Sequence, residues 1–155
     1  MSNVYFPFKE TNLNKLSEKH YSRRAQAITW NVKIDPPSYD PPCLQMFWAR
    51  ILENEGELVL NVNTIWRSRD AFKASYMNMF ALTDLQRIIA DEISKKINKK
   101  VRVGQYVDIS NSFHIYGSYY EDFKKFLETV KSRKYEDRVW DSQFAEPFFE
   151  IGKEK

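Results

Sequence analysis

Apolar side chains recur at every second position in three segments of the first half of the chain, which is the pattern of half-buried strands. In the first segment Ile28, Trp30 and Val32 fall on one face, which we expect to be buried. A short polar turn that contains Gly56 joins the other two segments, and this arrangement predicts a β-hairpin. The predicted strands are residues 25–34, 43–53 and 58–66.

Four prolines interrupt the alternation between the first and second predicted strands, at positions 36, 37, 41 and 42. Proline has a fixed φ and no backbone N–H, so this stretch can extend neither a helix nor a strand ladder. We therefore predict a stiff, extended loop, and Cys43 is the first residue after it.

The apolar period becomes that of a helix from Tyr76 to Ile97, and Asn98 and two lysines end it. Strand-like residues follow at 101–109, and Ser118 can cap a second helix. The expected inner face of the first helix is Met77, Phe80, Ala81, Leu85, Ile88, Ile89, Ile93 and Ile97, and that of the second is Tyr119, Phe123, Phe126, Leu127 and Val130.

This order of elements predicts an α+β fold, with a mostly antiparallel or mixed twisted sheet and the long helix on one face. Because apolar and aromatic side chains occur on both faces of the strands, we expect the second face to pack against another subunit. The length fits one domain over residues 1–155. The polar residues 1–20 predict a loosely ordered N-terminal segment, and residues 131–155 carry no assignment.

The composition excludes several classes of protein. Four glycines form no glycine-rich phosphate loop, and a net charge of +3 lacks the dense basic stripe of a nucleic-acid-binding protein. One cysteine and two histidines do not suffice for a structural zinc site, and a lone cysteine suits a reducing, cytoplasmic location. No apolar run reaches the roughly 18 residues of a membrane span. We therefore expect no metal, nucleic-acid or membrane partner.

Cys43 becomes a candidate nucleophile when the polar residues that follow it are considered together. Arg67 and Ser68 can bind a phosphate, because a guanidinium presents forked donors and a hydroxyl adds another. Asn78 offers one donor and one acceptor to the edge of a pyrimidine. These are parts that can hold a phosphorylated nucleoside and attack its base.

His114 and Tyr116 complete the set, because they alternate on one face of an extended segment, where their polar tips could meet a sugar hydroxyl. Each member also has an ordinary structural interpretation. A lone cysteine is most often a small buried apolar residue, and an arginine–serine turn is often a solvated charged turn. An asparagine can help to cap a helix, and a His–Tyr pair can be half-buried. The order of the set, rather than any one member, favours a nucleotide site.

The ordered motifs resemble the later two-thirds of the thymidylate synthase family. The resemblance extends from about Ser22 to about Val130, and the eleven-residue step from Arg67 to Asn78 agrees with it. The family's amino-terminal third has no counterpart in residues 1–20. The matching segments are Ser22-Arg23-Arg24, Trp30-Asn31-Val32, Pro41-Pro42-Cys43, Arg67-Ser68-Arg69-Asp70, Asn78 and His114-Ile115-Tyr116.

The resemblance implies a thymidylate synthase-type methyltransferase in which Cys43 is the catalytic nucleophile. Cys43 would add to ring carbon six of deoxyuridylate, which makes ring carbon five able to accept a one-carbon unit from 5,10-methylenetetrahydrofolate. Hydride transfer from the folate, which is a co-substrate, would then give the methyl group of thymidylate. Asp70 would hold the pterin of the folate.

The resemblance also implies the residues that bind the nucleotide, and it implies a homodimer. Two arginines would reach across the dimer interface to the phosphate in the partner's site. An asparagine at position 78 favours uracil over cytosine. The implied ligands are Arg67 and Ser68 for the phosphate, with Arg23 and Arg24 from the second subunit, Asn78 for the base, and His114 and Tyr116 for the ribose hydroxyl.

Two positions and one segment depart from the family pattern. Leu44 stands where His is common, Trp66 stands where Gln is common, and residues 110–113 replace a Gly-Asp segment. The family's amino-terminal third also carries a catalytic glutamate. Three alternatives therefore stay open: a shortened, catalytically incomplete homologue that only binds a pyrimidine nucleotide, a pyrimidine nucleotide hydroxymethylase, and an interaction domain that keeps the fold without the ligand.

Overall fold

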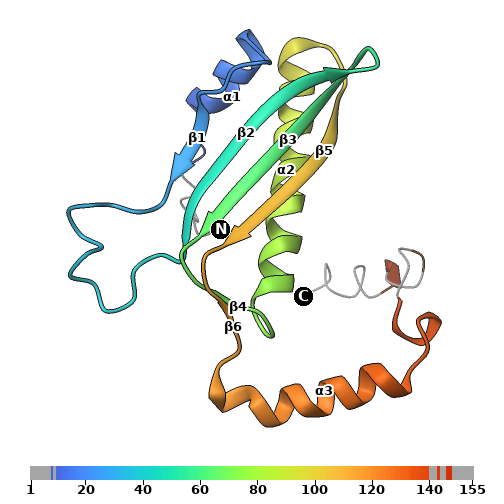
Figure 1. Cartoon of the computed structure of the whole chain (residues 1–155). Coiled ribbons are helices and arrows are strands. Elements are labelled where there is room, and N and C mark those ends of the chain that lie inside the picture. Colours follow the sequence, from blue (N-terminus) through green and yellow to red (C-terminus); the bar gives the residue numbers. More distant parts are fainter. Residues whose placement is uncertain (1–7, 9, 140–142, 144–145, 148–155) are drawn as a thin grey trace. The chain divides into compact units, whose positions relative to one another are not determined.

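The computed structural model describes residues 8, 10–139, 143, 146 and 147. It divides the chain into two compact units, Met1–Ile115 and Tyr116–Lys155, which are described separately. The prediction of one domain over residues 1–155 stays a prediction. Figure 1 shows the elements of both units.

A four-stranded mixed sheet is the framework of the first unit (Figure 1). β1, β2 and β3 are antiparallel neighbours, and β5 lies parallel to β3 at the edge of the sheet. The mixed sheet and the helices confirm the predicted α+β class. The strands are β1 (Ala25–Ile28), β2 (Leu44–Asn54), β3 (Glu57–Trp66) and β5 (Val101–Ser110).

The hairpin of β2 and β3 forms as predicted, with its turn at residues 55 and 56. Glu55 and Gly56 both have positive φ angles, of 52° and 81°. Glycine adopts this conformation without steric cost, which makes the tight turn accessible. Every second residue of β3 faces the core, and Leu58, Leu60 and Val62 are at most 2% exposed.

The core lies between the sheet and α2 (Ser75–Ile97), the long helix that the periodicity predicted. The helix ends at Asn98, which has a left-handed φ of 50°. Met77, Phe80 and Ile88 were expected on its inner face but are 63%, 60% and 44% exposed. Apolar residues occur on several sides of this helix, so the helical period alone did not identify the face that packs against the sheet. The residues it buries are Ser75, Leu82, Gln86, Ile89, Ala90 and Ile93.

Helix α1 (Glu10–Glu18) occupies part of the segment that the polar composition suggested was loosely ordered. Leu16 is fully buried in the core, and the side-chain amide of the buried Asn12 donates a 3.1 Å hydrogen bond to the carbonyl oxygen of Gln26. A nine-residue helix is marginal on its own in water, so these tertiary contacts account for its order.

Strand β1 is shorter than predicted, and the face expected to be buried was wrong. Ala25 and Ala27 face the core with 0% and 4% exposure, whereas Ile28 and Val32 are 55% and 75% exposed. Trp30 lies half-buried beyond the end of the strand. A period of two identifies two faces but does not say which one is covered, and here the small residues pack inward.

The face of the sheet opposite the core carries a row of four apolar side chains, one from each strand. The register places Ile28 beside Met46, Met46 beside Ile65, and Ile65 beside Ile109. Ile28 and Ile109 are 55% and 47% exposed, and the two central residues are half-buried. The row gives a physical basis for the expected packing of this face against another subunit, which stays a prediction.

The second unit contains α3 (Tyr120–Ser132) between two 3₁₀ turns, η1 (Gly117–Tyr119) and η2 (Glu136–Arg138). Ser118 was predicted to cap this helix, but it lies inside η1, and Tyr119 is the N-cap residue. No residue of α3 is buried in the part of the chain that the structure describes.

Candidate functional site

Cys43 and Arg67 are hydrogen-bonded neighbours where the β2–β3 hairpin meets the proline-rich loop. The backbone N–H of Arg67 donates a 2.9 Å hydrogen bond to the carbonyl oxygen of Cys43. This contact continues the ladder one position beyond the pair of Leu44 and Trp66. The hairpin register therefore brings the predicted nucleophile and the predicted phosphate ligand together.

The guanidinium group of Arg67 holds the loop that leads to Cys43. Its Nε donates a 3.1 Å hydrogen bond to the carbonyl oxygen of Pro42, and its Nη2 donates to that of Pro41. The carboxylate of Asp40 lies 3.7 Å from Nη2. An arginine has five N–H donors, and this side chain is 35% exposed, so donors remain available to an anion from solvent.

The thiol of Cys43 lies half-buried and packs against the edge of the core. The side-chain amide of Gln45 donates a 2.7 Å hydrogen bond to the carbonyl oxygen of Pro42, which adds a second anchor for the loop. Partial exposure beside a positive charge is the environment in which a cysteine becomes nucleophilic. Cys43 has this partial exposure, and its predicted role as the nucleophile stays a prediction.

Ser68 directly precedes the short strand β4 (Arg69–Asp70) in the chain, and Asn78 comes after it, in α2. Both residues are half-buried. Asn78 is in the first turn of α2, where its backbone N–H donates a 2.9 Å hydrogen bond to the carbonyl oxygen of Ala74. Ala74 is the N-cap residue, and no side chain caps the helix. The side-chain amide of Asn78 is therefore not used as a cap of α2.

Asp70 and His114 are register partners in a two-stranded parallel sheet made by β4 and β6 (Phe113–His114). The N–H of Ala71 donates a 2.8 Å hydrogen bond to the carbonyl oxygen of His114. The Oδ1 atom of Asp70 accepts hydrogen bonds from two backbone N–H groups that follow it, at 2.9 and 3.1 Å. The structure therefore joins the predicted folate ligand and one predicted ribose ligand.

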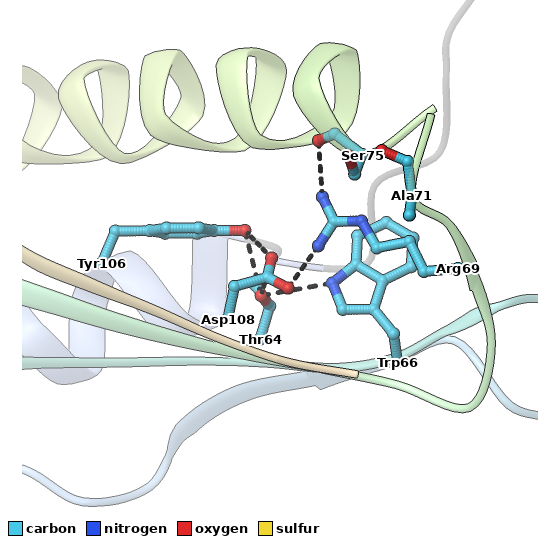
Figure 2. Close-up of polar contacts among 7 residues, drawn as sticks. All are labelled: Thr64, Trp66, Arg69, Ala71, Ser75, Tyr106 and Asp108. Carbon is cyan, nitrogen blue, oxygen red and sulfur yellow. Dashed lines mark hydrogen bonds and ion pairs between the residues drawn. The ribbon is translucent and has the colours of Figure 1, made fainter. Parts of the chain in front are cut away.

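A buried polar network that the sequence did not reveal surrounds Arg69, which is 3% exposed (Figure 2). Its Nη1 forms an ion pair with Asp108, and its Nη2 donates a 2.9 Å hydrogen bond to the carbonyl oxygen of Ser75. The guanidinium carbon lies 4.3 Å from the centroid of the Trp66 ring, a cation–π contact. Arg69 thus connects β4, β5 and the start of α2.

Asp108 is the acceptor at the centre of this network (Figure 2). Its Oδ2 accepts hydrogen bonds from Tyr106 Oη at 2.7 Å and Thr64 Oγ1 at 3.1 Å, while Trp66 Nε1 donates to Thr64 Oγ1 at 3.3 Å. Burial alone would raise the pKa of the Asp108 carboxyl, but the hydrogen bonds from Arg69 and Tyr106 outweigh it and hold this pKa below its usual value. Burial also raises the pKa of the Tyr106 hydroxyl.

The strand alternation contained a signal for this network. Thr64 and Trp66 continue the buried face of β3, and Tyr106 and Asp108 stand two positions apart on β5. A carboxylate on a covered strand face requires a charged or hydrogen-bonding partner. Arg69 was not recognised as that partner, because its segment has the composition of an exposed charged turn.

A cavity of about 330 Å³ borders the network. A volume of this size is at the lower end of the range for small-molecule sites. Its walls come from β4, β5, β6 and α2, the elements that also carry several predicted ligands. The lining residues are Arg69, Ser75, Met79, Asp108, Ser110 and Phe113.

Arg23 and Arg24 lie far from Cys43 along the sheet. The residue after them, Ala25, pairs with Ala49 of β2, which is six positions from Cys43. Because a strand rises about 3.3 Å per residue, the backbone of this arginine pair lies about 20 Å from that of Cys43. They line a second hollow of about 210 Å³ together with Lys19, Tyr21 and Ser22. One chain therefore does not bring them to the predicted nucleophile.

Tyr116 is the first residue of the second unit, and its ring packs edge-on against Tyr119 with 5.9 Å between the ring centroids. Among the residues that the structure describes, no group of three or more His, Cys, Asp or Glu side chains could hold a metal ion. In the same part of the chain, no helix is long and apolar enough to cross a membrane.

The sequence model of one protein family matches most of the chain. Residues 9–143 match the model described as thymidylate synthase. This range includes all the residues singled out above.

Two curated relatives are each named "Putative thymidylate synthase". The protein of Methanocaldococcus jannaschii is 36% identical over 123 residues. The alignment covers 72% of this chain and 51% of that protein. The protein of Methanothermobacter marburgensis is 31% identical over 120 residues, covering 77% of this chain and 48% of its own length. The chain spans about half the length of these relatives.

Proposed function

The chain belongs to the thymidylate synthase family, and from this premise we propose that it methylates deoxyuridylate to thymidylate through a covalent adduct at Cys43. The observation that carries the proposal is the 2.9 Å hydrogen bond that joins the backbones of Cys43 and Arg67. It supports a site in which the nucleophile and the phosphate ligand have a fixed spacing.

Cys43 forms and then breaks the covalent bond to the base. Its thiolate adds to ring carbon six of deoxyuridylate, and the electron pair of the ring double bond moves to carbon five and the adjacent carbonyl. Carbon five forms a bond to the one-carbon unit and then loses its proton, while the bond between that unit and the folate nitrogen breaks and leaves a methylene group on the pyrimidine. Hydride from the folate adds to this methylene group, and the folate leaves as dihydrofolate. At the end of the reaction the carbon–sulfur bond breaks, which releases thymidylate and restores the thiolate.

Arg67 and Ser68 hold the phosphate of the nucleotide. The Arg67 guanidinium is anchored to the carbonyl oxygens of Pro41 and Pro42 and is still 35% exposed. An anchored guanidinium loses little further conformational freedom when it binds an anion.

Asn78, His114 and Tyr116 bind the remainder of the nucleotide in this proposal. The amide of Asn78 is not used as a helix cap, so it can pair with the donor and acceptor edge of uracil. The two ring side chains contact the ribose hydroxyl. For His114 the support is the backbone hydrogen bond from Ala71, three residues after Ser68; the role of Tyr116 rests on the resemblance to the family.

The co-substrate is 5,10-methylenetetrahydrofolate, which supplies both the one-carbon unit and the hydride. Asp70 holds its pterin ring. One oxygen of Asp70 accepts two backbone hydrogen bonds, and this fixes the carboxylate while its other oxygen can accept from a heterocyclic N–H group.

A homodimer completes the site in this proposal. Arg23 and Arg24 lie about 20 Å along the sheet from Cys43 of their own chain, so they can serve a phosphate only in a partner's site. The apolar row that contains Ile65 and Ile109 gives a second copy a surface to cover. Such rows are typical of interfaces between identical subunits.

A catalytically incomplete homologue that only binds a pyrimidine nucleotide is the second candidate. The observation in its favour is that the chain spans about half the length of its curated relatives. Deoxyuridylate would then bind without release of the proton from ring carbon five. A hydroxymethylase would instead release that proton and transfer the one-carbon unit without the hydride.

The decisive experiment uses fluorodeoxyuridylate with methylenetetrahydrofolate, because fluorine at carbon five stops the reaction at the covalent stage. The expected result is an adduct at Cys43, detected by mass spectrometry of the intact chain and its peptides. Cys43→Ser is the matched control and should form no adduct. A folded protein that forms no adduct but binds deoxyuridylate in calorimetry supports the binding-only candidate, and one that does neither contradicts both.

A further inference from the structure

Arg69 links three segments of the first unit that carry proposed nucleotide ligands: those of Ser68, Asn78 and His114. It directly follows Arg67 and Ser68 in the chain. Its backbone N–H donates a 2.8 Å hydrogen bond to the carbonyl oxygen of Ser112, which leads into the strand that carries His114. Its Nη2 donates a 2.9 Å hydrogen bond to the carbonyl oxygen of Ser75, in the turn of α2 that carries Asn78.

The Arg69 guanidinium is itself fixed by its surroundings. One side stacks on Trp66 with 4.3 Å from the guanidinium carbon to the ring centroid, and Nη1 forms the ion pair with Asp108. Asp108 is in turn held by Thr64 and Tyr106 (Figure 2). The partners of Arg69 lie on the paired strands β3 and β5, so the three ligand-bearing segments share one anchor on the four-stranded sheet.

We propose that Arg69 is a positioning residue: through Asp108, Trp66 and Ser75 it sets the relative geometry of the phosphate-binding turn, the base-binding turn of α2 and the strand of His114. This role rests on the proposed function for its effect on nucleotide affinity. It also explains why Trp66 is tolerated where the family commonly has Gln, since Trp66 is 7% exposed and serves as the surface on which Arg69 stacks.

The chemistry of the position requires arginine. A guanidinium is planar, so it can stack on an indole while its two terminal nitrogens donate in different directions. A lysine ammonium could satisfy Asp108 but could not stack in the same way and reach the Ser75 carbonyl at the same time. The contacts of Arg69 are therefore specific to its shape as well as to its charge.

A double substitution separates positioning from stability. Breaking one partner of a buried ion pair leaves an unpaired buried charge, whereas replacing both partners by apolar residues is often neutral or stabilising. Arg69→Met/Asp108→Leu should therefore remain folded while it lacks the anchor. The matched control is Arg87→Met/Asp91→Leu, which removes an exposed ion pair of 3.1 Å on α2 by the same two changes.

The first readout is amide hydrogen exchange in the full chain without ligand. The backbone N–H groups of Ala71 and Asn78 donate hydrogen bonds to the carbonyl oxygens of His114 and Ala74. Their hydrogens should exchange at least about tenfold faster in the Arg69 double variant than in the parent. The amide of Ile51, bonded to the His20 carbonyl at 3.1 Å, should be unchanged. Equal rates at Ala71 and Asn78 in the parent and the double variant would overturn the proposal.

The second readout is the dissociation constant of deoxyuridylate by calorimetry. The Arg69 double variant should bind about tenfold more weakly than the parent, and the Arg87 control should bind as the parent does. Parent-like affinity in the folded double variant overturns the positioning role and leaves the proposed function intact. If the parent itself does not bind but the exchange rates change as expected, the proposed function fails and Arg69 remains the anchor of the three segments.

The variant Arg69→Lys decides the matter if the double variant does not fold. It keeps a positive charge beside Asp108, so the buried carboxylate is not left unpaired. Faster exchange at Ala71 and Asn78 is expected, because the bond to the Ser75 carbonyl and the stack on Trp66 are lost. Unchanged exchange in Arg69→Lys counts against the proposal.

Discussion

The backbone N–H of Arg67 donates a 2.9 Å hydrogen bond to the carbonyl oxygen of Cys43, and the side chain of Arg67 also binds the loop that precedes this cysteine. One residue therefore fixes the position of the proposed nucleophile and supplies the proposed phosphate ligand.

Arg67→Ala should weaken deoxyuridylate binding by about 1.5–3 kcal/mol, the range for a lost hydrogen bond to a charged group. Calorimetry measures this change directly. Arg87→Ala is the control, because Arg87 pairs with exposed carboxylates on α2 and should leave the affinity unchanged. An Arg67→Ala variant with parent affinity would show that the phosphate binds elsewhere.

Alkylation of Cys43 by iodoacetamide should slow when deoxyuridylate is present, because the nucleotide covers the thiol. The chain has one cysteine, so the mass increase reports on this site without ambiguity. Arg67→Ala should largely remove the protection at the same nucleotide concentration. Equal alkylation rates with and without a saturating amount of nucleotide would place the ligand away from Cys43.

Asp108→Asn should destabilise the fold by about 3–5 kcal/mol at neutral pH, because it leaves the charge of Arg69 buried without its partner. The folded state lowers the pKa of Asp108 below its usual value of 3.8. A lowered pKa contributes stability above the unfolded pKa, and this contribution is lost as pH falls through the folded pKa.

Urea unfolding at several pH values therefore checks the role of Asp108. The stability gap between the parent and Asp108→Asn should be constant near neutrality and should narrow below about pH 4. Asp91→Asn is the control, since it changes an exposed carboxylate and should shift stability by less than about 0.5 kcal/mol. A gap that widens in acid would contradict the assignment.

Gly104→Ala should destabilise the sheet by about 1–3 kcal/mol, because the new methyl group would clash with the neighbouring strand β3. A Cβ atom there would lie 2.4 Å from Val59 Cγ1 and 2.9 Å from the carbonyl oxygen of Leu60. The Leu60 oxygen belongs to the backbone of β3, so it cannot turn away from the methyl group as the end of a flexible side chain could. Gly117→Ala is the control, with nothing within 4 Å of its added Cβ. Denaturant unfolding of both variants measures the difference in stability. Similar unfolding midpoints for the two variants would argue against the close contact between β3 and β5.

Ile65→Lys should convert the proposed dimer to a monomer, because it places a charge in the centre of the apolar row on the open face of the sheet. Analytical ultracentrifugation measures the molecular mass. Ile88→Lys introduces the same charge on α2, at a position that is 44% exposed, and should leave the mass unchanged. A parent that sediments as a monomer at all concentrations contradicts the dimer.

The sequence was sufficient for the elements whose signal is local. The alternation of Leu58, Leu60 and Val62 predicted β3, and the turn at Gly56 predicted the hairpin. Prolines excluded regular structure before Cys43, since a missing N–H acts at its own position whatever the rest of the chain does. The helical period likewise predicted α2 and its end near Asn98.

The sequence was insufficient where a face or a partner had to be chosen. Ile28 and Phe80 were expected inside and lie outside, because a period is the same for the covered and uncovered sides of an element. The order of α1 depends on burial of Leu16 in a core made by distant strands. Such outcomes depend on packing between elements.

The sequence by itself determined which chemical groups this protein has and in what order they occur, and that order indicated the family. The tertiary structure alone decided that Cys43 lies beside Arg67, that Asp70 lies beside His114, and that Arg69 is a buried anchor and not a surface charge. The physical reason is range. Backbone preferences act between neighbours in the chain, whereas the partner of a charge is set by the register between strands that the chain brings together only on folding.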